Sequence, residues 1–439
     1  MSESSATGSG AARLLGMLQE EAYRKWRVEP LRNVPGFTGL STKGAAEAMF
    51  EGIRQQVDYA DLIWSGEFAD RAKRATETGD PHQFHDLKAP TRFENPMTYL
   101  AISEASTRVY TKARELDWPM PAQPLVGTMP TGDIHAYTVP VPQEMRVDES
   151  DADHLIIFDW QFFLFVHLFS KAIARAFPSA PSQKHKGFSE LSLDEKKIRH
   201  NIKGNPLIAD EFTDLPVAYA TTGEPGRSAA YTSAREFKRR SLDTGKRELA
   251  GTIRESMELF VLGHEHGHVV QRNRGDSLAL ARSLIRPGQS EEEVRSNAAL
   301  RGPLGEIDAD LYGLLLSIGI TQSGLDFATA YMGIDAYFTG ADMMRRALSV
   351  LRRGRPDYAA TPTHPSVTLR RDLLRESLLK LPLTEQARAD AVANGKTVEL
   401  VAELLWDRAY RTLKGLHRRG TDLAPWWQSQ HVTPPRPFA

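Results

Sequence analysis

Hydrophobic residues recur every three or four positions along most of this chain, and the pattern predicts a predominantly helical protein. Between Gly44 and Thr76 the apolar side chains follow close to helical spacing. Asn95-Pro96 places a proline in the first turn of a second helix, which we expect to run to about Leu116. Residues 11–120 are therefore expected to form a helical N-terminal region.

The same periodicity continues through the rest of the chain. We expect an apolar helix from Trp160 to Phe177 and a long helix from Arg247 to Val270, whose broad apolar face indicates burial. Further helices are predicted over 276–285, 291–300, 304–318, 324–352, 364–379 and 397–416. Gly302-Pro303 is expected to separate two of them.

Three short segments have the composition of strands. Ile134 to Val139 is rich in strand formers, and the prolines at 140 and 142 fit an edge strand. Leu155 to Phe158 is its expected partner. Leu215 to Thr221 is the one strand that we expect in a polar insertion over about 178–244. The fold class that follows is α+β, predominantly helical, with a small antiparallel sheet.

Four prolines between Trp118 and Gly132 mark a linker or a seam between domains. We therefore expect a disordered N-terminus over 1–10, the helical region over 11–120 and a central domain over 121–380 that carries the insertion. A helical extension with a Pro/Trp-rich tail is expected over 381–439.

Composition excludes several classes of site. The 439 residues contain no cysteine, so His, Asp and Glu remain as the strong metal ligands. The 55 Lys and Arg residues nearly balance the 56 Asp and Glu residues, so net charge gives no reason to expect a nucleic-acid partner. The most apolar stretch, Leu155 to Phe169, is too short for a membrane span. We expect a cytoplasmic protein without membrane spans, and its oligomeric state is left open.

The strongest chemical signal is His264-Glu265-His266-Gly267-His268, a His-Glu-x-x-His motif in the long helix. Positions four apart share one helix face, so His264 and His268 can point two imidazoles at one metal ion. Glu265 is placed where its carboxylate can serve as a base. His266 faces the other side and is read as a packing or surface residue. The motif predicts a Zn²⁺ site.

A catalytic zinc site needs a third protein ligand, and Glu306 is the best downstream candidate. Asp310 lies four residues further on the same helical face, where it can accept a hydrogen bond from a ligand histidine. Asp308 points elsewhere at helical spacing. The alternative, in which Asp308 or Asp310 is the ligand, stays open.

With these residues the chain resembles the gluzincin metallopeptidases, and among them the CAAX-prenyl-protease/HtpX-like group. The resemblance implies a zincin-like core in the central domain, with the small sheet packed on the motif helix. It also implies that an edge strand binds the substrate backbone, here His135, Ala136 and Tyr137, although His135 replaces the usual Asn. His364-Pro365 followed by Arg370 matches a further family element.

The chain departs from this group in its long insertion and in the missing membrane spans. A prenylated or membrane-embedded substrate is therefore not implied. The resemblance covers roughly Thr131 to Leu379. The expected partner is a protein or peptide substrate.

The activity expected from these residues is zinc-dependent hydrolysis of a peptide bond by an endopeptidase. Glu265 is the expected general base, and His364 or Arg370 would stabilise the oxyanion unless they are structural. A partner-restricted or regulatory metallopeptidase-like protein, with a switch or defence role, is one alternative. A zinc hydrolase acting on a non-peptide amide is a second, and a structural zinc site is a third.

Overall fold

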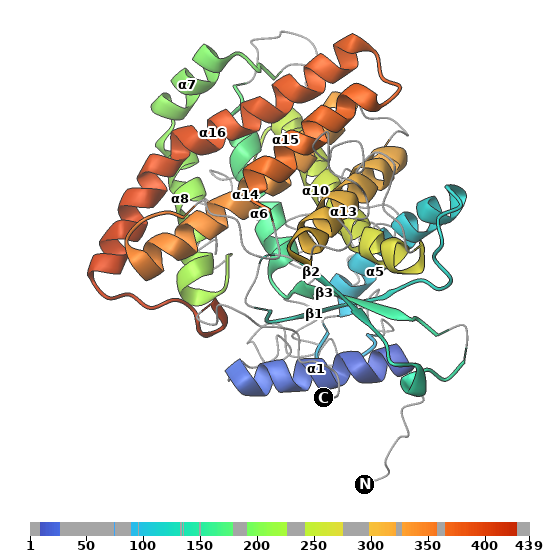
Figure 1. Cartoon of the computed structure of the whole chain (residues 1–439). Helices are drawn as coiled ribbons and strands as arrows, with labels where there is room; N and C mark the ends of the chain where they lie inside the picture. The colour runs from blue at the N-terminus through green and yellow to red at the C-terminus, as the bar shows by residue number, and fades with distance from the viewer. Residues whose placement is uncertain are drawn as a thin grey trace. The chain divides into compact units, whose positions relative to one another are not determined.

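The structure, a computed structural model, describes residues 9–26, 74, 89–94, 96–131, 134, 136–148, 151–178, 191–225, 242–274, 298–321, 327–357 and 365–427 (Figure 1). The described residues fall into two compact units, one ending at Trp160 and the other starting at Gln161. None of the described helices is both long and apolar enough to cross a membrane. The four regions expected from the sequence remain predictions.

In its described residues the first unit has two long helices, α1 (Gly10–Trp26) and α5 (Pro96–Glu115), and a three-stranded sheet. Its strands are β1 (Leu125–Met129), β2 (Ala136–Pro140) and β3 (His154–Asp159), with a 3₁₀ turn at Gln143–Met145. The strand order is β1-β3-β2. β2 pairs antiparallel with β3, as predicted, whereas β1 pairs parallel with β3. The expectation of an antiparallel sheet is thus wrong, because it lacked β1 and the sheet is mixed.

Helix α1 packs its apolar face on this sheet. Leu14, Leu15 and Leu18 form one buried cluster with Leu155 and Ile157 of β3. Helical spacing on α1 and period-two alternation on β3 therefore give two apolar surfaces that cover each other.

A fully buried carboxyl, Glu94, joins three parts of this unit. Its Oε1 accepts from the backbone N–H of Thr128 at 2.5 Å and from Gln19 Nε2 at 2.6 Å. The hydroxyl of Thr128 lies 2.8 Å from Oε2, and Thr91 donates to Gln19. Burial raises the pKa of Glu94 to about 7, although hydrogen bonds from Thr128 and Gln19 oppose the shift. Glu94 thus connects α1, β1 and the segment that precedes α5.

In its described residues the second unit has helices, turns and loops and no strand, apart from an isolated bridge residue at 191. The helices that the structure describes there are α6 (Phe162–Ala176), α7 (Glu195–Gly204), α8 (Pro206–Thr222), α10 (Thr244–Arg274), α13 (Ala298–Thr321), α14 (Phe327–Arg353), α15 (Val367–Ser377) and α16 (Glu385–Arg418), with 3₁₀ turns at Leu378–Lys380 and Pro425–Trp427. α10 contacts α6, α13 and α14. α14 and α16 lie side by side along much of their length (Figure 1).

α10 is the helix that carries the motif, and it is buried on several faces. Ile253, Met257, Phe260, Leu262 and Val270 are each at most 1% exposed. A helix surrounded by others on several sides holds its side chains in fixed directions, which suits metal ligands.

Three sequence-based expectations about elements of this unit are wrong or incomplete. Leu215 to Thr221 is helical, because it lies inside α8, which starts at the Asn205 cap and ends at Gly223 with a positive φ of 74°. Gly302-Pro303 does not separate two helices, since α13 runs through it. The C-terminal helix begins at Glu385 rather than near residue 397. The helix predicted over 276–285 lies outside the described residues, and so does the one predicted over 44–76 except for Arg74, which is helical.

Candidate metal centre

Glycines allow α10 and α13 to approach closely at the motif. A Cβ built on Gly313 would lie 2.8 Å from the carbonyl oxygen of Phe260 and 3.0 Å from the backbone nitrogen of His264. A Cβ on Gly267 would lie 2.7 Å from the Cβ of Tyr312. Backbone atoms cannot move aside as a flexible side chain can, so the crossing requires glycine. It places Glu306 of α13 opposite the two motif histidines.

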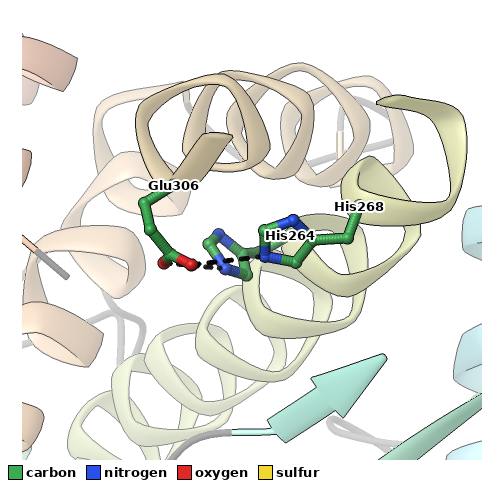
Figure 2. Close-up of side chains that lie close together, drawn as sticks. All are labelled: His264, His268 and Glu306. Atoms are coloured by element: carbon green, nitrogen blue, oxygen red, sulfur yellow. Dashed lines mark ion pairs between the residues drawn. The ribbon is translucent and has the colours of Figure 1, made fainter. Parts of the chain in front are cut away.

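The three predicted ligands gather at this crossing (Figure 2). The Nε2 of His264 lies 3.6 Å from one carboxylate oxygen of Glu306, and the Nε2 of His268 lies 3.6 Å from the other. One ligand atom from each residue can be chosen so that all three lie within 4.8 Å of one another. The side chains are 9%, 23% and 12% exposed for His264, His268 and Glu306, so the centre is largely shielded from solvent.

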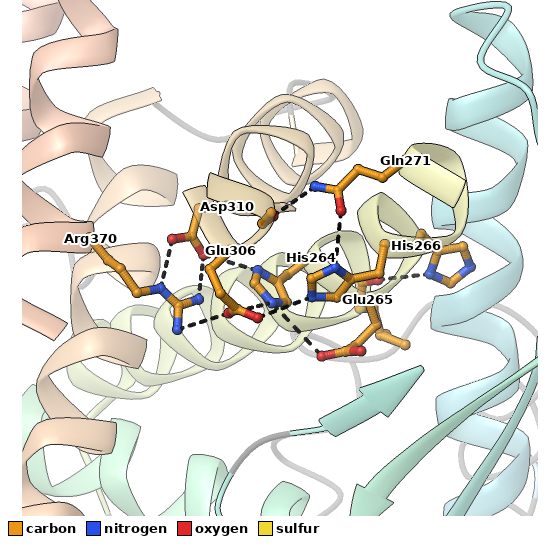
Figure 3. Close-up of polar contacts among 10 residues, drawn as sticks. His264, Glu265, His266, Gln271, Glu306, Asp310 and Arg370 are labelled. Atoms are coloured by element: carbon orange, nitrogen blue, oxygen red, sulfur yellow. Dashed lines mark hydrogen bonds and ion pairs between the residues drawn. The ribbon is translucent and has the colours of Figure 1, made fainter. Parts of the chain in front are cut away.

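On the side away from Glu306, His264 is hydrogen-bonded to the carboxylate of Asp310, which is itself hydrogen-bonded to Arg370 (Figure 3). Its Nδ1–H donates to Asp310 Oδ1 at 2.9 Å. Arg370 donates to both oxygens of Asp310, from Nε at 2.8 Å and from Nη2 at 2.6 Å. The same guanidinium lies 3.5 Å from Glu306 Oε2. The Ser366 side chain caps the start of α15 by accepting from Leu369 N–H, which fixes the turn that carries Arg370.

His268 is held by a neutral group. Its Nδ1 lies 3.2 Å from Gln271 Oε1, and Gln271 Nε2 donates to the carbonyl of Gly305 at 2.7 Å. Gly305 directly precedes Glu306, so one amide contacts both a ligand on α10 and the backbone beside the ligand on α13 (Figure 3).

Charge is distributed unevenly over these groups. Burial opposes ionisation of Asp310, but the charge and hydrogen bonds of Arg370, with that of His264, lower the pKa of Asp310 to about 2. Burial lowers the pKa of His264, yet its hydrogen bond to Asp310 and the charges of Asp310 and Glu306 raise it overall. Burial and the neighbouring His264 lower the pKa of His268. Asp310 is therefore anionic, and His268 is predominantly neutral at pH 7.

Two further motif residues lie on different sides of α10 (Figure 3). Glu265 is 3% exposed, and its Oε1 lies 4.0 Å from His264 Nε2, on the side of the ligand atoms. His266 is fully buried and donates from Nδ1 to the carbonyl of Leu262 at 2.7 Å. Burial lowers the pKa of His266 to about 4. His266 is thus a packing residue, one of the two roles expected for it.

The donor set fits Zn²⁺. In a tetrahedral site with bonds of about 2.1 Å, neighbouring ligand atoms lie about 3.4 Å apart. The two Nε2-to-carboxylate separations of 3.6 Å are close to this value. On both histidines the Nδ1 atom is engaged in a hydrogen bond, so Nε2 faces the other ligands. Asp310 faces Nδ1 of His264 and is not part of the triad, which favours Glu306 over Asp310 as the third ligand.

The remaining predicted site residues have different outcomes. His135 and His364 lie outside the described residues. Ala136 and Tyr137 lie in β2, at an edge of the described sheet, in the other unit. Arg370 is 2% exposed and directs its guanidinium at Asp310 and Glu306. Of the two roles expected for it, oxyanion stabilisation or a structural role, this geometry fits the structural one. Asp308 is buried and is not part of the triad.

Sequence reasoning missed Gln271. Its position three residues after His268 places it on the same helical face, and that spacing is the signal that could have identified it.

A scan against protein-family models and searches of curated proteins and of solved structures found no match to this chain. The site therefore has to be interpreted from its own chemistry.

Proposed function

We propose that this protein is a zinc-dependent hydrolase that cleaves a peptide bond, with His264, His268 and Glu306 as metal ligands. The observation that carries the proposal is the position of Glu265. A buried carboxylate stands 4.0 Å from the Nε2 atom of a ligand histidine, while neither Glu265 nor Asp310 belongs to the ligand triad. Among the described residues this triad has no fourth protein ligand, which supports an open catalytic position over a closed structural one.

Each group has a distinct role in the proposed chemistry. Zn²⁺ held by the triad would supply a Lewis acid and a water molecule of lowered pKa. Glu265 would accept the proton of the attacking water and pass it to the leaving amine. Asp310 and Gln271 would hold the two imidazoles so that Nε2 faces the metal.

The peptide nature of the substrate rests on the resemblance to gluzincins. In that group an edge strand binds the substrate backbone, and β2, taken by itself, is at an edge of the described sheet. The proposal includes a cytoplasmic location and a protein or peptide substrate, as expected from the sequence.

The test is Glu265→Gln, which removes the base and leaves the ligands in place. We expect peptide hydrolysis to fall by about 10²–10⁴-fold, because general-base catalysis contributes about that much. Zinc content, measured by elemental analysis of the purified protein, should stay at the wild-type level. Glu248→Gln on the same helix is the matched control and should change neither quantity.

The outcomes separate the alternatives. Retained turnover in Glu265→Gln would contradict the assigned base. Zinc bound in wild type without cleavage of a broad peptide mixture would favour the partner-restricted protein or the non-peptide amidase. The absence of zinc from the wild-type chain would refute the metal centre itself.

A further inference from the structure

Gln271 contacts two functional parts of the centre at once. Its side-chain oxygen faces Nδ1 of His268, and its side-chain nitrogen donates to the carbonyl of Gly305. Of the two proposed ligand histidines, His264 has a carboxylate, Asp310, at its Nδ1, whereas the Nδ1 of His268 faces the amide oxygen of Gln271.

The orientation of this amide follows from its partners. A backbone carbonyl can only accept a hydrogen bond, so the NH₂ group of Gln271 must face Gly305. Its oxygen must then face His268, and an oxygen of this kind can only accept. Nδ1 of His268 therefore carries the proton, which leaves the lone pair of Nε2 directed at the metal position.

We infer that Gln271 is a positioning residue that selects the metal-binding tautomer of His268 and holds Glu306 in place opposite that histidine. This inference rests on the proposed zinc site. Gln271 acts through His268 and through the backbone of Gly305, and it is assigned no contact with metal or substrate. Its contact with Gly305 is independent of the glycine crossing, so it gives α10 and α13 a second connection at the ligands.

The two ligand histidines would then differ in how strongly they are held. His264 faces an anion whose charge is balanced by Arg370, whereas His268 faces a neutral amide. A carboxylate makes an imidazole a stronger donor to a metal than an amide does. Ligation by His268 is therefore the weaker of the two and depends more on geometry.

Metal affinity in two variants of the full-length chain tests the inference. Gln271→Met keeps the length of the side chain and removes both hydrogen bonds. Gln271→Glu keeps the acceptor for His268 and loses the donor to Gly305. Affinity for Zn²⁺, measured by competition with a chromophoric chelator, should fall 10–100-fold in Gln271→Met and by less in Gln271→Glu. Gln386→Met on the exposed face of α16 is the control and should match wild type.

A role limited to fold stability would give a different result. It would lower the unfolding midpoint of the metal-free protein and leave the zinc affinity of Gln271→Met within twofold of wild type, and that outcome would overturn the inference.

The tautomer can also be measured without metal. In protein labelled with ¹⁵N-histidine, the signal of His268, assigned by its loss in His268→Asn, should show Nδ1–H in wild type and a shift toward Nε2–H in Gln271→Met. An Nε2–H form in the wild type would overturn the inference. If wild type binds no zinc, the proposed function fails, and this measurement still decides the role of Gln271.

Discussion

Arg370 and Asp310 form the most buried ion pair of the candidate metal centre, with exposures of 2% and 1%. Two hydrogen bonds join them, and the carboxylate has a third from His264. A pair of this kind contributes modest net stability when it is complete, but removal of one member leaves an uncompensated buried charge. The guanidinium therefore compensates the buried negative charge of Asp310 beside His264, a proposed metal ligand.

Arg370→Leu should lower the free energy of unfolding by about 3–5 kcal/mol, because Asp310 would lose its counter-charge. Adding Asp310→Asn should restore a large part of the loss, since no unpaired charge then remains. Urea unfolding of the two variants measures both quantities. Arg411→Leu on the exposed part of α16 is the matched control, with an expected change within about 0.5 kcal/mol. A loss below 1 kcal/mol in Arg370→Leu would contradict the role of Arg370 as the counter-charge of buried Asp310.

Among the site residues, those that a sequence could reveal are the ones whose roles depend on spacing along a single helix. The ligand pair His264 and His268 and the pair Glu306 and Asp310 are each four residues apart. The contact of Arg370 with Asp310 joins residues 60 apart, and no local pattern specifies such a contact. The contact of Gln271 with Gly305, 34 residues away, is of the same type.

At the scale of elements, the crossing of α10 and α13 depends on three small residues. An added Cβ would lie 2.7 Å from Tyr312 at Gly267 and 2.8 Å from the Phe260 carbonyl at Gly313, which is too close for a methyl group. At Gly263 it would lie 3.0 Å from the Cα of Gly313, which is a tight contact. The glycines cost helix propensity, about 1 kcal/mol each relative to alanine. The close approach that they permit is what places Glu306 within 3.6 Å of the histidines.

Gly313→Ala should therefore separate the two helices. We expect a loss of stability of about 1–3 kcal/mol from overpacking, together with weaker zinc binding. Gly415→Ala in α16 is the control, because its added Cβ would meet only the side chain of Arg419 at 3.6 Å. That variant should be neutral or more stable by about 0.5–1 kcal/mol. Thermal unfolding and zinc titration of both variants measure the effects, and equal behaviour would contradict the tight crossing.

Element types were predictable where a long periodic pattern existed, as in α6, α10 and α14. β1 was missed because its five residues stand between Pro124 and Pro130, and the prolines pointed to a linker. Leu215 to Thr221 was misread because a short apolar run does not distinguish a strand from a buried helix. The deciding signals for α8, Asn205 before Pro206 and the left-handed Gly223, stand at its two ends.

At the scale of the whole molecule, each unit contains a fully buried carboxyl group, and the two groups differ in their protonation behaviour. In the second unit Asp310 is anionic, because Arg370 and His264 compensate its burial. In the first unit the groups that donate to Glu94 are neutral, and Tyr23 and Tyr99 are titratable groups within its electrostatic reach. Glu94 therefore takes up a proton near neutral pH, whereas Asp310 does not.

The raised pKa of Glu94 predicts a pH-dependent stability for the first unit. Its pKa is about 7 in the fold against an ordinary 4.5, so the folded state binds more protons between these values. The stabilisation is complete below pH 4.5 and is lost as pH rises through about 7, with a slope of up to about 1.4 kcal/mol per pH unit. Glu94→Gln should flatten this slope, because an amide does not ionise.

The measurement is urea unfolding between pH 5 and 8, read at peptides of α1 and β1 by pulsed hydrogen exchange at one labelling pH. Thr107→Val on the exposed side of α5 serves as the control and should keep the wild-type slope. A slope that persists in Glu94→Gln would assign the pH dependence to other groups.

Zinc should act on the other unit. A ligand that binds only the folded state stabilises it by RT ln(1 + [L]/Kd), about 2.7 kcal/mol when its concentration is 100 times Kd. Removal of metal with a chelator should therefore speed hydrogen exchange in α10 and α13 and leave α1 unchanged. Unchanged exchange in α10 would contradict a zinc site there.

The groups that support the two histidines come almost entirely from two short stretches of sequence. Gly305, Glu306 and Asp310 fall in a six-residue stretch of α13. The two histidines, Glu265 and Gln271 fall in a nine-residue stretch of α10 that begins at Gly263, and only Arg370 of the groups named above comes from another helix. The pair of patterns Gly-His-Glu-x-Gly-His-x-x-Gln and Gly-Glu-x-x-x-Asp-x-x-Gly, spaced as at Gly263 and Gly305, is therefore a compact search string. It can be sought in chains that share no other similarity with this one, and it can be grafted onto a designed helical hairpin to ask how little of the protein a zinc site of this kind requires.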